Sequence, residues 1–200
     1  MGLTNMMKNK IDFNTYWQKE FSEFLPFCHS LKYNYPDRWF RIHSLPNSKR
    51  YADTKDEYQT IINRQNQLFD TVIGERTNIM LVFAICTYDV TNENYAKIID
   101  YKEFRKIKTI NLSQTEPENY EDNIFLDIYV KYTRWHKNEY NKILKAIADD
   151  KVRFLFVCPS KNRIIGPYDG GVDVIMENEV ARDKMKIKYK NWLSNREDGW

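Results

Sequence analysis

The sequence contains little cysteine, and none of it is arranged to bind a metal. Cys28, Cys86 and Cys158 are far apart and lie among apolar neighbours, without a CxxC pair or the Cys/His spacing of zinc sites. Isolated thiols of this kind are typical of buried side chains in a reducing compartment. We therefore expect no disulfide, no metal and no cofactor.

A long apolar segment is also absent. The longest apolar run, residues 79–86, is too short to span a bilayer, and the first ten residues lack the apolar core of a signal peptide. We therefore expect a cytoplasmic protein without membrane contact, in which residues 1–10 form a flexible N-terminus and residues 11–200 form one domain.

The chain has no strong excess of charge of either sign. Its 31 basic and 28 acidic residues give a formal net charge of +3. This balance argues against nucleic-acid binding, because phosphate neutralisation usually requires a clustered basic face. Histidine is scarce as well: His29, His43 and His136 fall in no pattern of a nucleophile or a metal site. Without a coherent catalytic set, the sequence favours a protein that is not an enzyme.

Apolar and aromatic residues are abundant. They amount to 42% and 15% of the 200 residues, enough to bury a core without metals or disulfides. Periodicity and turn residues predict helices over about 14–25, 54–73, 137–148 and 178–193, with a short one over 92–99. Strands are predicted over 39–44, 79–86, 104–112, 124–133 and 152–158, with two more within 163–176 and an exposed loop over 113–123. The irregular order predicts a single α+β domain, whose mixed central β-sheet of about five to seven strands is flanked by about four helices.

Two helix starts carry capping-box patterns. Thr15 with Gln18 predicts the start of the first helix, and Thr54 with Glu57 that of the second.

The first candidate site lies between the 39–44 strand and the second helix. Alternation places Arg41 and His43 on the face opposite Phe40 and Ile42. Further on, three residues lead into the helix N-terminus, where exposed N–H groups and nearby cations would hold an anion: Lys49, Arg50 and Tyr51. The alternative, which is more common, is that these cations pair with nearby carboxylates. His43 also has the chemistry of a general base.

The second candidate site is the Asp-Gly-Gly segment between the last two strands. Adjacent Gly170 and Gly171 allow positive φ or the close approach of another group. Asp169 and Asp173 would share a cation in one interpretation. The pattern favours a hairpin turn instead, since the ligand set of a calcium loop and the ending of a P-loop are both absent. Tyr168 precedes this turn and completes the candidate binding residues.

Three segments carry a family resemblance: RIHSLPNSKRYA at 41–52, GPYDGGVDVI at 166–175 and KYKNWLSNREDG at 188–199. Together they resemble a bacterial protein family described as a domain of unknown function. The resemblance covers nearly the whole chain and implies a single domain of this length. It assigns no catalytic residue. Small cytoplasmic families of this kind often include immunity proteins that neutralise a cognate toxin.

From this class, and from tyrosine and tryptophan as residues favoured at interfaces, we expect a non-enzymatic protein-binding module such as a toxin-neutralising immunity protein. The alternative is an enzyme or ligand-binding protein acting on a phosphorylated or nucleotide-like small molecule, with the two candidate sites forming its pocket. A homo-oligomer is a third possibility.

Overall fold

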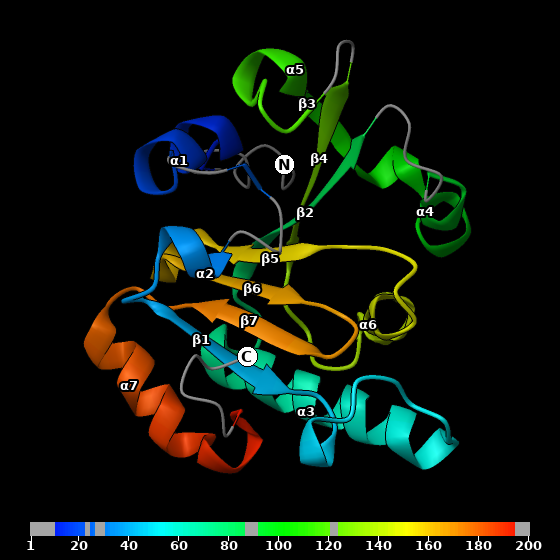
Figure 1. The fold of residues 1–200 in the computed structure, drawn as a ribbon, viewed down its shortest axis with the longest axis vertical. Helices are drawn as coiled ribbons and strands as arrows, with labels where there is room; N and C mark the ends of the chain where they lie inside the picture. Colours follow the sequence, from blue (N-terminus) through cyan, green and yellow to red (C-terminus); the bar gives the residue numbers. More distant parts are fainter. Residues whose placement is uncertain (1–10, 23–24, 27–30, 87–91, 121–123, 195–200) are drawn as a thin grey trace, which may run out of the picture.

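A seven-stranded antiparallel sheet organises the chain (Figure 1). The computed structural model describes residues 11–22, 25–26, 31–86, 92–120 and 124–194. The strand order is β1-β7-β6-β5-β2-β4-β3, and each neighbouring pair is antiparallel. The α+β class and the strand number predicted from the sequence are confirmed, and the expected mixed sheet is an antiparallel one.

The strands follow the predicted segments closely. Their bounds are β1 Trp39–His43, β2 Asn78–Cys86, β3 Arg105–Asn111, β4 Phe125–Arg134, β5 Leu155–Cys158, β6 Arg163–Pro167 and β7 Gly171–Ile175. The 104–112 segment is an edge strand, as expected, while β2 is interior and apolar because its side chains enter a core on each face of the sheet.

Helices cover both faces of the sheet (Figure 1). In the described part of the chain, the helices of eight or more residues lie where the sequence predicts its four longer helices: α1 Phe13–Glu20, α3 Lys55–Val72, α6 Asn141–Ala148 and α7 Glu179–Lys188. The shorter helices are α2 Leu31–Asn34, α4 Asn92–Ile98 and α5 Leu112–Thr115. Side chains of α3, α4 and α6 belong to one core, and those of α1, α2 and α5 to the other.

The two capping predictions have different outcomes. Thr54 and Glu57 form the predicted reciprocal capping box at the start of α3. The prediction for Thr15 is wrong, because α1 begins at Phe13 and its N-cap is Asp12. The Asp12 carboxylate accepts a hydrogen bond from the Thr15 N–H at 3.0 Å. A carboxylate at this position satisfies a free donor and also complements the helix dipole.

Several expectations concern other parts of the chain. The loop expected over 113–123 contains most of α5, while residues 121–123 lie outside the described part. The flexible segment expected over residues 1–10, together with Cys28, His29 and residues 195–200, also lies outside it. Among the residues that are described, no helix has both the length and the apolar character needed to cross a membrane.

Candidate functional site

The two candidate sites lie next to each other in the fold, because β1 pairs with β7. In the register of this pair, Arg41 is opposite Asp173 and His43 is opposite Gly171. β6 and β7 form the hairpin that the Asp-Gly-Gly pattern predicts, and Tyr168 and Gly171 exchange two backbone hydrogen bonds of 2.9 and 3.3 Å across its turn. Residues separated by more than a hundred positions are thus brought to one end of the sheet.

The two glycines of the turn are explained by close approach and not by positive φ. Gly74 is the glycine with positive φ in the described residues, so Gly170 and Gly171 do not use the positive φ that glycine allows. A Cβ at Gly171 would lie 2.2 Å from the backbone oxygen of Ile42 in β1. A Cβ at Gly170 would lie 3.0 Å from a ring carbon of Tyr168. Glycine therefore lets β1 and the tyrosine ring pack against the turn.

A buried ion pair joins β1 to β7. The Arg41 guanidinium donates from Nε and Nη2 to the two carboxylate oxygens of Asp173, both at 2.7 Å, and Trp39 Nε1 donates to the same carboxylate at 2.9 Å. Only 7% of the Arg41 side chain and 4% of the Asp173 side chain are exposed. Burial by itself would lower the pKa of Arg41, but the Asp173 carboxylate outweighs it and raises that pKa. Arg41 is therefore a permanent charge held in place.

Aromatic rings pack on this arginine. The Arg41 guanidinium carbon lies 4.7 Å from the ring centre of Tyr168 and 5.6 Å from that of Trp39. Such contacts suit the planar, weakly hydrated guanidinium group. Burial raises the pKa of the Tyr168 hydroxyl to about 12, so this hydroxyl is protonated at neutral pH.

A second ion pair joins the loop after β1 to the hairpin turn. Arg50 Nε donates to Asp169 at 2.6 Å, and the Tyr51 hydroxyl donates to the same carboxylate. Burial alone would raise the pKa of Asp169, but these hydrogen bonds and the charges of Arg50 and Arg153 hold it below its usual value. The Asp169 side chain is 2% exposed, whereas that of Arg50 is 62% exposed. One end of this pair thus faces solvent.

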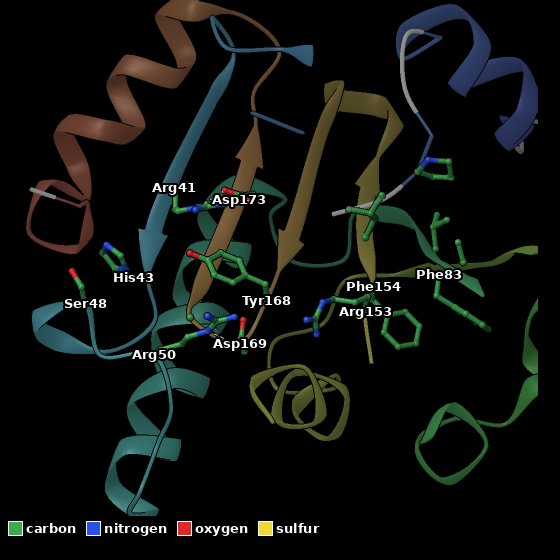
Figure 2. Close-up of a pocket in the computed structure, with 15 residues that line it drawn as sticks. Arg41, His43, Ser48, Arg50, Phe83, Arg153, Phe154, Tyr168, Asp169 and Asp173 are labelled. Carbon is green, nitrogen blue, oxygen red and sulfur yellow. Dashed lines mark hydrogen bonds and ion pairs between the residues drawn. The ribbon is translucent and has the colours of Figure 1, made fainter. Parts of the chain in front are cut away.

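Both ion pairs line a cavity of about 400 Å³ (Figure 2). Seven of the ten residues predicted from the sequence contribute to its wall: Arg41, His43, Arg50, Tyr168, Asp169, Gly170 and Asp173. Tyr168 lies in the middle of this group, while Arg50 and Arg153 point toward each other from opposite sides of Asp169 (Figure 2). A volume of this size fits a small molecule.

Four of the wall residues, Arg41, Asp173, Leu155 and Val82, belong to one row that crosses five strands. Arg41 is paired with Asp173, Asp173 with Gly166, and Leu155 with Val82. The β5–β6 register, with Phe156 opposite Ile165, places Leu155 beside Gly166. Gly166 brings no side chain to the middle of this row, so a residue without a side chain separates its charged half from its apolar half.

Three predicted residues take other roles. Lys49 pairs with Asp53 at 2.8 Å and with Glu57 at 2.5 Å, and the Glu57 carboxylate also accepts from the backbone N–H groups of Asp53 and Thr54. The start of α3 is therefore supplied with its own carboxylate, and Lys49 follows the alternative interpretation, in which the cation pairs with nearby carboxylates. Tyr51 supports Asp169, and Gly171 makes room for β1.

Sequence reasoning missed two polar wall residues and the apolar wall. Ser48 is the last residue of the short turn Pro46–Ser48 after β1, and Arg153 comes just before β5. Arg153 Nη2 pairs with Asp150, and 41% of the Arg153 side chain is exposed. Alternation identifies which side chains share a face of one strand. Predicting Val82 and Leu155 as wall residues would also have required the knowledge that β5 is a neighbour of β2.

The third segment of the resemblance reaches the site through Arg64 of α3. The Arg64 guanidinium carbon lies 5.0 Å from the Trp192 ring centre, and its Nη1 donates to the backbone oxygen of His43 at 3.2 Å. Burial lowers the pKa of His43, and the charges of Arg41 and Arg64 lower it further. The imidazole is therefore neutral at pH 7, and its Nε2 is buried without a hydrogen-bond partner among the described residues.

One protein family matches the chain over residues 27–197, under the description "Domain of unknown function (DUF3885)". The chain belongs to this family. No curated protein and no solved structure matches the chain. The DUF3885 region contains both ion pairs and every described wall residue except Pro26, whereas α1 precedes it.

Within the described ranges, the DUF3885 region brings no three histidine, cysteine or carboxylate side chains together as a metal site would need. The cavity offers a different chemistry: guanidinium donors, a neutral imidazole, a phenol and an apolar wall.

Proposed function

We propose that this protein binds a small anionic, phosphorylated ligand in the cavity. The observation that carries the proposal is the convergence of Arg41, His43 and Asp169 on one cavity that also contains Arg50 and Arg153. Three arginines and two aspartates line it, so the wall carries one positive charge in excess while His43 is neutral. Arginine is suited to phosphate because its planar fork can donate two hydrogen bonds at once.

Arg50 and Arg153 are the residues that would contact the anion. Asp169 takes only the Nε donor of Arg50, whose side chain is mostly exposed, and the described residues leave its Nη1 and Nη2 without a hydrogen bond. Arg153 uses Nη1 and Nη2 within its own neighbourhood but keeps 41% of its side chain exposed. Arg41 has a different role, since its charge is neutralised by Asp173 and it supports the wall.

A thermal-shift screen against nucleotides and sugar phosphates tests the proposal. At a ligand concentration of 100 times Kd, binding adds about 2.7 kcal/mol to the free energy of unfolding. In a protein of this size that corresponds to a rise in Tm of about 5 °C or more. Arg50→Gln and Arg153→Gln should each reduce the affinity about tenfold, as the loss of a charge-assisted contact predicts.

Arg105→Gln is the matched control, because Arg105 is an exposed arginine on the far edge strand β3. It should leave the ligand response unchanged. If no phosphorylated compound raises Tm, or if the control lowers the affinity as much as Arg153→Gln, the proposal is rejected.

A protein-binding role, such as neutralisation of a toxin, is the second candidate. Val180 and Ile187 favour it: they are 64% and 75% exposed and lie seven residues apart, on one face of α7. Many of the aromatic residues that suggested an interface from the sequence belong to the core instead, Trp17, Trp39 and Trp135 among them. Co-purification with the product of the adjacent gene, and rescue of cells from that product, test this role. Absence of both would reject it.

A further inference from the structure

We infer that the cavity recognises a planar ring as well as an anion, and that Tyr168 is the surface on which this ring stacks. The ligand class is then a nucleotide, or a phosphorylated heteroaromatic compound of the same shape. This inference rests on the proposed function, since it concerns the second half of the same ligand.

Tyr168 is held in one orientation. The Arg41 guanidinium covers one side of the ring at 4.7 Å, and Arg41 is itself fixed by two hydrogen bonds to Asp173. The turn packs on the edge of the ring so closely that a Cβ at Gly170 or Gly171 would come within about 3 Å of it. A ring fixed in this way loses little conformational entropy when a ligand binds.

Because Arg41 covers one face of the ring and the turn packs on its edge, the opposite face is the surface on which we place the ligand ring. The residue is half-buried, lines the cavity and lies in the middle of the wall residues (Figure 2). Flat rings stack well on such a surface because dispersion and offset packing add to the burial of apolar area. Saturated sugars lack the flat face that this arrangement uses.

The neighbouring groups complete a site for a ring with an attached phosphate. Val82 and Leu155 provide an apolar part of the wall, and Gly166, in the same row, adds no side chain beside Leu155. Arg50 and Arg153 flank Asp169 close to Tyr168 (Figure 2). The charge of Arg50 is close enough to act on the Tyr168 hydroxyl. A ring on Tyr168 would thus have its phosphate within the field of both arginines.

Isothermal titration of the full chain with matched ligands tests the inference. The ligands are AMP, UMP, ribose 5-phosphate and inorganic phosphate, which differ in the presence of a base and of a sugar. Stacking of a base on an aromatic side chain should make at least one nucleotide bind about tenfold more tightly than ribose 5-phosphate. Tyr168→Leu should remove most of this difference, and Tyr168→Phe should keep it.

Different outcomes separate the two proposals. If ribose 5-phosphate binds as tightly as both nucleotides, stacking is rejected while the anion site stands. If the nucleotides bind more tightly but Tyr168→Leu, shown to be folded by circular dichroism, keeps the full difference, Tyr168 is the wrong surface and the inference is overturned. If none of the four ligands binds, the inference is overturned, and the wider phosphate screen decides the proposed function. Should Tyr168→Leu fail to fold, the wild type still tests the inference, because equal binding of ribose 5-phosphate and the nucleotides overturns it.

Discussion

Two Arg–Asp pairs join the same two segments of the chain, yet they differ in almost every physical respect. Arg41–Asp173 is buried at both ends, bidentate and stacked between aromatic rings. Arg50–Asp169 has one buried and one exposed end and a single direct hydrogen bond. The two pairs consist of the same residue types but have different roles. Arg41–Asp173 fixes the wall of the cavity, whereas Arg50–Asp169 places a partly exposed positive charge beside the cavity.

The largest effect should come from breaking the buried pair. Asp173→Asn leaves the Arg41 charge inside the protein without its carboxylate, which should lower the free energy of unfolding by about 3–5 kcal/mol. Urea denaturation measures this change. Asp37→Asn is the control, because Asp37 is exposed, and it should stay within about 0.5 kcal/mol of the wild type. A loss below about 1 kcal/mol for Asp173→Asn would show that the two pairs are energetically alike.

Substitution of the two glycines beside the ion pairs should also lower the free energy of unfolding by unequal amounts, more at Gly171 than at Gly170. Gly171→Ala places a methyl group against a backbone oxygen of β1 at 2.2 Å, and we expect a loss of about 2 kcal/mol or more. Gly170→Ala meets only side chains, at 3.0 Å or more, and its φ is not positive. It should therefore stay within about 1 kcal/mol of the wild type. Thermal and urea unfolding of the two variants decide this, and equal losses would contradict the explanation by close approach.

The smallest effect should come from the half-exposed pair, and it should depend on pH. The pKa of Asp169 is lower in the folded protein than the ordinary value of an aspartate in an unfolded chain, so its contribution is present at neutral pH. That contribution is lost as pH falls below this value through the folded-state pKa. Asp169→Asn should cost about 1 kcal/mol at pH 7, since solvent screens the exposed Arg50, and less at pH 3. Urea denaturation at the two pH values measures this change. A stability loss of Asp169→Asn that is larger at pH 3 than at pH 7 would contradict the prediction.

The local parts of this architecture could be predicted from the sequence. The Thr54–Glu57 capping box, the alternation of Phe40 with Arg41, and the Asp-Gly turn depend on residues a few positions apart. The prediction of Thr15 as the cap of α1 was wrong because a competing cap, Asp12, lies three residues earlier, and its negative charge better suits the helix dipole.

The partners across the sheet could not be predicted in this way. Alternation places Arg41 and Asp173 each on one face of its strand, but it does not state that β1 and β7 are neighbours. Arg153 was missed for the same reason, since it reaches the cavity only because β5 lies between β6 and β2. The sequence thus indicates many of the residues that form the site, whereas the order of the strands decides which of them lie next to one another.

The β1–β7 pairing has a consequence for how the cavity comes into being. Arg41 and Asp173 are 132 residues apart, and Arg50 and Asp169 are 119 residues apart. Closing loops of this length costs chain entropy that local contacts cannot offset, so contacts of such high sequence separation form slowly and late. A nascent chain that has not yet released β7 from the ribosome has no wall for the cavity. Binding of the proposed ligand would therefore report that β1 has paired with β7, and cleavage of the chain between these strands would remove the covalent link on which the assembly of the cavity depends.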